Sequence, residues 1–258
     1  MGKIVAITNQ KGGVGKTTTS INLAASLART RRRVMLIDID PQGNATMGSG
    51  INKEEHPVTT YDVLLGLQPI EVARVPVEGG YDLVPANSRL SGAEVELIEL
   101  DRRERRLRGA LENLRAQYDY IFIDCPPALN LLTVNALVAA QSVMIPMQCE
   151  YYALEGLTAL LNTIRKIRET LNPQLEIEGL LRTMYDPRNN LDNEVSAQLK
   201  QHFGDKLYRT IIPRNIRLAE APSHGKPVIA YDMQSKGAQA YLALAGEMLR
   251  REQEAAAA

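Results

Sequence analysis

The fold of this chain follows from one stretch of sequence, Gln10-Lys11-Gly12-Gly13-Val14-Gly15-Lys16-Thr17-Thr18. It stands between an apolar run, Ile4–Thr8, and a helix-like pattern, Lys16–Arg29. A glycine-rich loop that leads from a strand into a helix is the setting of a phosphate-binding P-loop. Glycines let backbone amides approach phosphate oxygens, and a helix N-terminus favours an anion. The stretch therefore predicts an α/β fold with a nucleotide site after its first strand.

The residue types in this loop predict separate roles in binding ATP with Mg²⁺. Lys16 is expected to place its charge on the β- and γ-phosphates, and the Thr17 hydroxyl to bind the metal ion. The residues expected to contact ATP are Lys11, Gly12, Gly13, Val14, Gly15, Lys16, Thr17 and Thr18. Together they predict an ATPase.

Two acidic residues follow a second apolar run, Arg33–Ile37, which is typical of a strand buried on both faces. Asp38 and Asp40 are expected at the carboxyl edge of the sheet, where ligands bind in open α/β folds. Asp40 is the candidate for positioning the attacking water and is also expected near the metal ion, and Asp38 is the candidate for supporting the Mg²⁺ shell. Asp40-Pro41 followed by Gly43-Asn44 also fits a plain turn.

A third acid ends the apolar run Tyr120–Asp124, in the arrangement known as Walker B. Asp124 is expected to hold Mg²⁺ through water, and Pro126 to shape the loop beside the γ-phosphate. A lone acid at a strand end is common, so this motif gains its meaning from the P-loop that accompanies it.

Composition and periodicity predict one α/β domain over residues 1–254, a mostly parallel twisted sheet with helices on both faces, followed by a disordered tail, residues 255–258. Hydrophobic residues make up 45% of the 258, and 30 basic residues balance 30 acidic ones, which does not favour a globally basic nucleic-acid binder. Further strands are expected at Asp82–Pro85, Ser142–Pro146, Ile177–Thr183, Tyr208–Ile212 and Pro227–Ile229, and helices at Ser91–Arg115, Leu154–Leu171, Asn193–Phe203 and Gly237–Arg251.

One departure from the general P-loop pattern indicates a particular group of P-loop ATPases. Gln10 stands where that pattern has its first glycine, and a second lysine, Lys11, follows it. This resembles the deviant P-loop of the ParA/MinD-type ATPases. The resemblance implies that Lys11 reaches the phosphates of a partner subunit in an ATP-dependent homodimer, where it would act as an arginine finger does.

Two later segments, Thr183–Asn190 and Thr210–Gly225, resemble the chromosomal ParA (Soj-like) partitioning ATPases. The resemblance implies a switch for chromosome or plasmid segregation, with non-specific double-stranded DNA and a ParB-type centromere-binding protein as partners. It implies a cytoplasmic, nucleoid-associated protein without a membrane anchor, and it places Pro213 and Asn215 at the adenine.

The same resemblance makes Arg188 and Arg217 the expected DNA contacts. The stretch from Arg182 to Arg217 holds seven basic residues against four acidic ones, and a dimer would present this excess twice. Phosphate contacts of this kind position a duplex without reading its sequence. Ordinary surface arginines would look the same.

Three other functions are consistent with parts of the sequence. A membrane-cycling ATPase would need a basic amphipathic C-terminal helix, whereas the segment Met248–Glu254 is short and ends acidic. A reductase sharing an iron–sulfur cluster would need its cysteines in glycine-rich loops, whereas Cys125 and Cys149 follow strand-like runs. A regulator of cell-pole or flagellar placement would use the same ATPase cycle, and it stays open.

Overall fold

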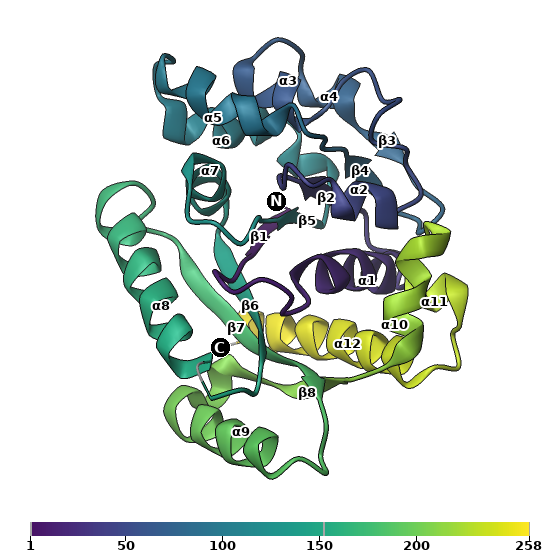
Figure 1. Ribbon diagram of the computed structural model, residues 1–258. Helices are drawn as coiled ribbons and strands as arrows, with labels where there is room; N and C mark the ends of the chain where they lie inside the picture. Colours follow the sequence, from purple (N-terminus) through teal and green to yellow (C-terminus); the bar gives the residue numbers. More distant parts are fainter. Residues whose placement is uncertain (1, 152, 258) are drawn as a thin grey trace.

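The computed structural model describes residues 2–151 and 153–257, which are organised around one eight-stranded sheet (Figure 1). The strand order is β3-β4-β2-β5-β1-β6-β7-β8. The strands are β1 (Lys3–Ile7), β2 (Val34–Asp38), β3 (Val75–Pro76), β4 (Asp82–Val84), β5 (Tyr120–Asp124), β6 (Ser142–Gln148), β7 (Glu176–Tyr185) and β8 (Leu207–Pro213). All neighbours pair in parallel except β3 with β4. The predicted mostly parallel sheet is confirmed.

Helices cover both faces of the sheet, as the apolar strands require. The α-helices are α1 (Lys16–Arg29), α2 (Asn44–Gly48), α3 (Thr60–Leu65), α4 (Ile70–Ala73), α5 (Leu90–Ile98), α6 (Arg106–Leu111), α7 (Leu131–Ala139), α8 (Ala153–Thr170), α9 (Asn190–Phe203), α10 (Ile216–Glu220), α11 (Val228–Tyr231) and α12 (Lys236–Ala257). Short 3₁₀ turns lie at Arg103–Arg105, Arg115–Gln117, Gly204–Lys206 and Ala221–His224.

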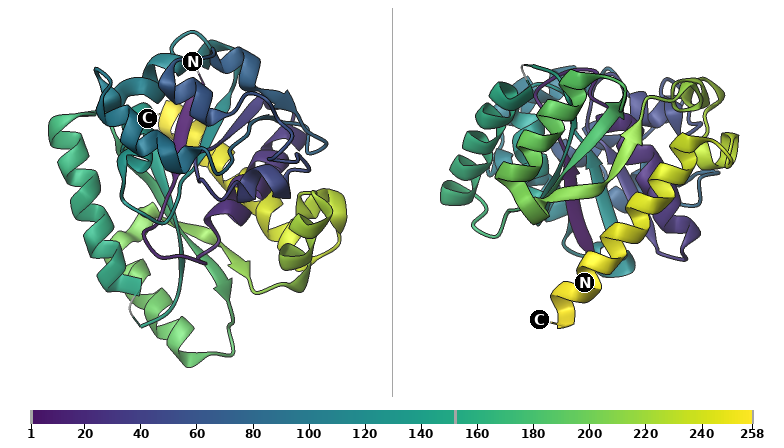
Figure 2. Two further views of the ribbon diagram at one scale, coloured as in Figure 1. Left: turned by 45° about the horizontal axis from the view of Figure 1, so that its top comes forward. Right: turned by 90° about the horizontal axis from the view of Figure 1, so that it is seen from below.

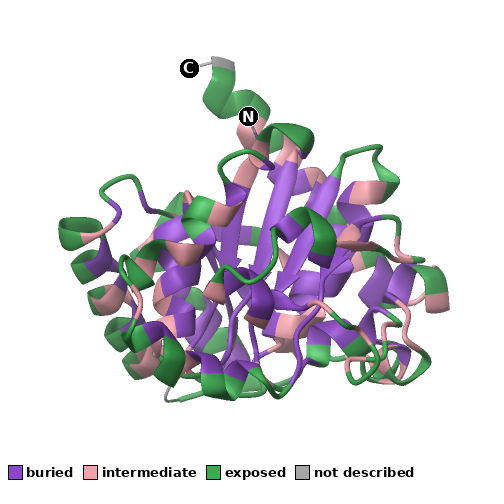
Figure 3. Cartoon of the chain, turned by 90° about the horizontal axis from the view of Figure 1, so that it is seen from above, coloured by how far each residue is buried: buried purple, intermediate pink, exposed green. Residues whose placement is uncertain are grey.

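Side-chain alternation along the central strands divides the interior into two apolar cores. Ile4 and Ala6 of β1 point into the core beneath α3 and α5 to α9, while Val5 and Ile7 point into the core beneath α1, α11 and α12. Figure 3 shows the buried strands between the two helical layers, with exposed residues outside. The two faces are therefore built from alternate residues of the same strands.

The carboxyl ends of the central strands meet at one edge of the sheet, and the P-loop follows β1 there. β1 lies between β5 and β6, with Ile7 opposite Asp124. β2 lies on the other side of β5, with Asp38 opposite Asp124. The strand order thus brings three separate sequence motifs to one place.

Two predicted elements differ from the structure. The helix predicted over Ser91–Arg115 is divided into α5, a 3₁₀ turn and α6, because Arg102 takes the left-handed conformation at φ 53°. The strand predicted at Pro227–Ile229 is instead the start of α11, for which Pro227 is the N-cap residue at φ −64°. Proline suits a helix start, where a missing N–H costs no hydrogen bond.

The C-terminal segment also differs in extent from the sequence expectation. Helix α12 continues through Ala257, into the segment for which the sequence predicts a tail. Its last turns extend beyond the body of the molecule, near the amino edge of the sheet (Figure 2, right). Among the described helices, none is long and apolar enough to cross a membrane.

Candidate functional site

The P-loop between β1 and α1 forms an open cradle of backbone amides. Gly13 and Gly15 have φ of 72° and 87°, which glycine adopts without a steric penalty. A Cβ added at Gly12 or Gly13 would meet no described atom within 4 Å, so the space beside these two residues is free for a ligand. Among the described residues, no side chain caps the N-terminus of α1. Its amides therefore stay available to an anion such as a phosphate.

Two side chains fix the loop to neighbouring strands. The Thr183 hydroxyl of β7 donates to the Val14 carbonyl at 2.7 Å. The Asn9 side chain donates to the Pro146 carbonyl at 2.8 Å and accepts from the Lys11 amide at 3.0 Å. The shape of the cradle is thus held from both of its ends, independently of a ligand.

The two lysines of the loop lie in different surroundings. Lys16 is 7% exposed, and its Nζ donates to the Lys11 carbonyl at 3.1 Å, across the loop. Burial lowers the pKa of Lys16, against the opposing effect of Asp124, Cys125 and Asp40. The Lys11 side chain is 43% exposed and forms an ion pair with Glu150, beyond the end of β6. Lys16 thus belongs to the interior of the cradle and Lys11 to its outer rim.

Asp124 joins β5 to the first turns of α1. Its carboxylate accepts from the Thr17 hydroxyl at 2.8 Å and from the Ser20 hydroxyl at 2.7 Å. The hydroxyl predicted to bind Mg²⁺ and the carboxylate predicted to support that ion are therefore in direct contact. A Mg²⁺ ion bound by the hydroxyl and by phosphate oxygens would have this carboxylate in its outer shell.

Asp38 and Asp40 have different partners. Asp38 is fully buried and accepts from both the amide and the hydroxyl of Thr46 of α2, at 2.8 and 2.7 Å. It also accepts from the Asp40 amide at 3.1 Å, while the Asp40 carboxylate accepts from the Gln42 amide at 2.9 Å. Asp38 therefore orders the turn that carries Asp40, and the carboxylate of Asp40 lies near enough to Lys16 to affect its pKa.

The two buried acids hold their protons more strongly than free aspartate does. Burial raises the pKa of Asp124 to about 7, and the nearby Asp38 adds to the effect, whereas the bonds from Ser20 and Thr17 oppose it. Burial likewise raises the pKa of Asp38 to about 6, against the bonds from Thr46. A divalent cation favours the ionised carboxylates, so its binding here would release protons.

The residues predicted at the adenine and beside the γ-phosphate lie on the same edge of the sheet. Pro213 ends β8 opposite Tyr185 of β7, two residues beyond Thr183, which contacts the P-loop. The Asn215 Oδ1 accepts from the Arg217 amide at 3.0 Å and caps α10, while its side-chain NH2 group has no hydrogen-bond partner among the described residues. Pro126 is buried directly after β5.

The two predicted DNA contacts are surface arginines with partners in their own chain. The Arg188 side chain is 88% exposed and forms two hydrogen bonds with Asp186, which hold the pKa of Asp186 down at about 2. The Arg217 side chain is 46% exposed and pairs with Glu220 at 2.8 Å and Asp232 at 3.3 Å.

Four residues that complete the site were not singled out from the sequence. Ser20 could have been found, because it lies three residues after Thr17 on the same helix face. Thr46, Glu150 and Thr183 could not, because their contacts depend on which strands become neighbours. Cys125 and Cys149 are free and buried.

This loop–helix cradle, with its lysine, hydroxyl and two strand-end carboxylates, defines a P-loop ATPase, with ATP and Mg²⁺ as its ligands. Residues 2–177 match the family model described as an AAA domain. The chain is 57% identical to the sporulation initiation inhibitor protein Soj of Bacillus subtilis, over 96% of this chain and 98% of that one. It is 54% identical to the chromosome partitioning protein ParA of Caulobacter vibrioides (98% and 96%) and 64% identical to an uncharacterised protein of Pseudomonas putida (98% and 96%). The chain belongs to the ParA/Soj family of chromosome-partitioning ATPases.

Solved structures of related proteins share the whole fold. Cobyrinic acid a,c-diamide synthase of Mycobacterium smegmatis, solved with an ATP analogue and magnesium, has a TM-score of 0.86 at 37% identity, covering 98% of this chain and 96% of that one. The septum site-determining protein MinD of Pyrococcus horikoshii, in complex with Mg-ADP, has a TM-score of 0.80 at 27% identity, with 96% of each chain covered.

Proposed function

We propose that this ATPase is a switch for the segregation of chromosome or plasmid DNA. With ATP bound, two copies form a sandwich dimer that binds double-stranded DNA without sequence preference. Hydrolysis, stimulated by a ParB-type partner, returns the chain to a monomer that releases the DNA. Similarity over nearly the full length to partitioning proteins, at 54–57% identity, supports this role over the synthesis of cobyrinic acid a,c-diamide named for the structural relative at 37% identity.

The observation that carries the proposal is the position of Lys11. Its side chain leaves the P-loop on the outside and forms an ion pair with Glu150, while Lys16 lies in the interior of the cradle. A lysine on the rim has no role toward the phosphates of its own chain, but it can reach those of a second copy facing it. Catalysis then depends on dimer formation, because the second charge arrives only with the partner.

The remaining roles in this proposal are assigned to the residues that the described contacts and the family resemblance bring to the site. Lys16 binds the β- and γ-phosphates, Thr17 binds Mg²⁺, and Asp124 supports that ion through water. Asp40 positions the attacking water, on a turn that Asp38 orders. The bound Mg²⁺ would supply charge neutralisation at the phosphates. Pro213 and Asn215 border the adenine.

The DNA step rests on the two exposed arginines. Arg188 lies in the loop after β7 and Arg217 lies in α10, which follows β8, on the edge of the sheet that carries the nucleotide site. Their partners are partly exposed acids of the same chain, and surface pairs of this kind contribute little free energy. Phosphates can therefore replace those acids when a dimer presents both arginines twice.

Fluorescence anisotropy of two unrelated labelled duplexes, with ADP, ATP or a slowly hydrolysed analogue, tests this function. We expect binding only in the triphosphate states, equal for both duplexes, and weakening with salt by a slope of about 0.9 per phosphate contact. Arg188→Glu and Arg217→Glu should abolish binding while light scattering still reports an ATP-dependent dimer. Equal binding in ADP and ATP, or a strong preference for one duplex, would contradict the proposal.

A further inference from the structure

The turn between α1 and β2 carries a dense, exposed positive charge that the function described so far does not use. Four of its five residues, Arg29, Arg31, Arg32 and Arg33, are arginines, and the fifth is Thr30. All five are exposed. We call residues 29–33 the arginine turn. It lies at the amino edge of the sheet, opposite the P-loop, since α1 runs from one edge to the other.

Backbone amides, the Thr30 hydroxyl and the Asp119 carboxylate, and not the guanidinium groups, hold the arginine turn in shape. The amides of Thr30 and Arg31 donate to carbonyls in the last turn of α1, each at 2.9 Å. The Arg33 amide donates to the Asp119 carboxylate at 2.8 Å. Arg31 takes a left-handed conformation, with φ 64°, to reverse the chain. The guanidinium groups are therefore not required for the fold of the turn.

Most of these guanidinium groups also lack an acidic partner. Within residues 2–151 and 153–257, no carboxylate oxygen lies within 4.0 Å of the side-chain nitrogens of Arg29, Arg31 or Arg32. Arg33 approaches Asp119 only at 3.8 Å. In contrast, Arg188 and Arg217 are both paired. The positive charges of the arginine turn are thus available to an anionic partner outside the described chain.

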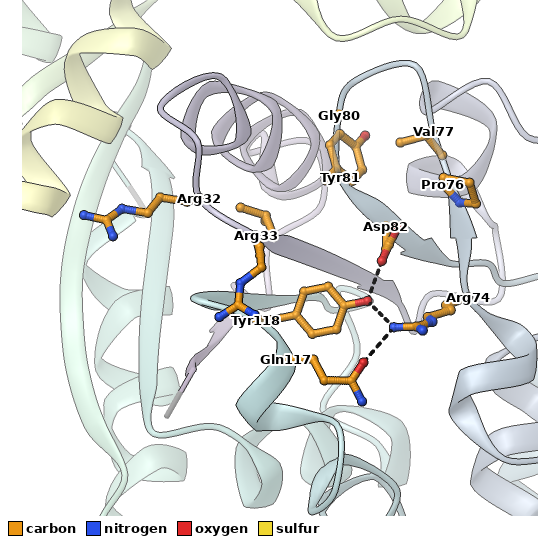
Figure 4. Close-up of a pocket in the computed structure, with 11 residues that line it drawn as sticks. Arg32, Arg33, Arg74, Pro76, Val77, Gly80, Tyr81, Asp82, Gln117 and Tyr118 are labelled. Atoms are coloured by element: carbon orange, nitrogen blue, oxygen red, sulfur yellow. Dashed lines mark hydrogen bonds between the residues drawn. The ribbon is translucent and has the colours of Figure 1, made fainter.

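Two adjoining cavities at this edge, of about 440 and 220 Å³, share Arg32 and Arg33 in their walls. The polar side chains inside the larger cavity already have hydrogen-bond partners. Arg74 donates to Tyr118 at 2.8 Å and to Gln117 at 3.2 Å, and Tyr118 donates to Asp82 (Figure 4). The Asp82 carboxylate would repel a small anion there. Arg32 extends away from the other lining residues (Figure 4). The rim therefore suits a large anion that lies across it.

The arginine turn is continuous with the expected DNA contact at Arg217. The Arg217 Nε lies 3.3 Å from Asp232, and the next residue, Met233, has its Sδ 4.0 Å from a terminal nitrogen of Arg29. Asp232 and Met233, at the start of the segment between α11 and α12, thus lie between Arg217 and Arg29. Both belong to the face of the sheet covered by α1, α11 and α12.

We propose that the arginine turn is a second phosphate-contacting part of the DNA interface, which extends it from Arg217 along α11 to the amino edge of the sheet. Its partner is the sugar–phosphate backbone of duplex DNA, since a series of unpaired, outward guanidinium groups matches a series of phosphates. This inference rests on the proposed DNA-binding function. The arginine turn would contribute additional phosphate contacts in every dimer, without recognising the base sequence.

The test uses the double variant Arg31→Gln/Arg32→Gln in the full chain. The matched control is Arg105→Gln/Arg108→Gln, which removes the same charge from exposed arginines of the 3₁₀ turn and α6 on the opposite face of the sheet. Affinity for a labelled duplex with ATP is measured by anisotropy over a salt series. Light scattering and ATP turnover without DNA check that the dimer and the nucleotide site are intact.

We expect the double variant to bind the duplex about three- to tenfold more weakly near physiological salt. Its salt slope should be lower by about 0.9 for each phosphate that the variant no longer binds. The control, and the charge-conserving Arg31→Lys/Arg32→Lys, should bind nearly as the unaltered chain does. Dimer formation and basal turnover should be unchanged in all variants.

Four results would overturn the inference. If the double variant keeps the unaltered affinity and slope while Arg217→Glu loses DNA, the arginine turn is not part of the interface and the proposed function stands. An equal loss in the control variant would show a general effect of charge. Loss of binding to anionic phospholipid vesicles, with DNA binding intact, would assign the turn to a membrane surface. If the unaltered ATP form binds no DNA, the proposed function fails and the inference fails with it.

Discussion

Asp38 and Asp124 lie opposite each other on the neighbouring strands β2 and β5, and both carboxylates are fully buried. Each is held by hydroxyl donors from a different helix: Thr46 of α2 for Asp38, and Thr17 and Ser20 of α1 for Asp124. Two ionised carboxylates at this spacing would repel each other, and burial adds to that cost. The carboxyl groups of Asp38 and Asp124 therefore hold protons that a bound cation would displace.

This pair predicts that the nucleotide-free chain loses stability as pH rises from about 4 to about 7. The pKa of Asp124 is raised from 3.8 to about 7, so over this range the folded chain keeps a proton that the unfolded chain releases. Asp124→Asn should remove part of the loss and raise the unfolding free energy near pH 8 by roughly 1–4 kcal/mol.

Urea unfolding at pH 5 and pH 8, without nucleotide or Mg²⁺, measures this effect. Glu112→Gln, at an exposed position, is the control and should follow the unaltered chain. A variant stability curve that runs parallel to that of the unaltered chain across this range would contradict the assignment of the stored proton to Asp124.

Lys16→Ala should weaken ATP binding about ten- to hundredfold, because a charge-assisted contact to phosphate is worth about 1.5–3 kcal/mol. Isothermal titration with ATP and Mg²⁺ gives the affinity. Lys166→Ala, which removes an exposed lysine of α8, serves as the control and should leave the affinity unchanged. Near-normal affinity of the Lys16 variant would mean that the backbone amides alone hold the phosphates.

Asp40→Ala should bind ATP but turn it over at least about a hundredfold more slowly, the usual contribution of a positioned acid or base. It should accumulate as a dimer, since hydrolysis no longer ends the ATP state. Phosphate release and light scattering on the same sample measure both effects. Normal turnover would return the turn after Asp38 to a purely structural role.

Lys11→Ala should keep much of its ATP affinity yet lose both the ATP-dependent dimer and hydrolysis, because Lys11 lies outside its own cradle. Glu150→Gln frees Lys11 without removing it, so this variant should retain the dimer. Light scattering with ATP compares the two. A stable, active Lys11→Ala dimer would make Lys11 an ordinary surface lysine.

Local patterns were enough to predict the central strands and the long helices. The run Tyr120–Asp124 and the helix Lys16–Arg29 have the predicted bounds, because continuous apolar runs and regular helical periodicity are strong local signals. The segment between Ser91 and Arg115 was wrong as one helix, since its many charged residues gave helical composition but no apolar anchor between Leu100 and Leu107. The strand predicted at Pro227–Ile229 was wrong because two β-branched residues after proline also fit a helix start.

The sequence placed the P-loop and three carboxylates in one site because parallel strands carry their carboxyl ends to one edge. It could not place Glu150 beside Lys11 or Thr183 beside Val14, because those contacts arise only once β6 lies next to β1 and β7 lies next to β6 in the sheet. Partners of this kind depend on the order of the strands in the sheet, which no short stretch of sequence determines by itself.

The hydrogen bond from Thr183 to the Val14 carbonyl has a mechanical consequence. It joins the middle of the P-loop to the end of β7, and the chain leaves that strand toward Arg188 within five residues. A displacement of the Val14 carbonyl must either carry the end of β7 with it or break this bond. The loop that holds phosphate and the loop that carries Arg188 thus share one rigid support, and a change in the first has a short route to the second.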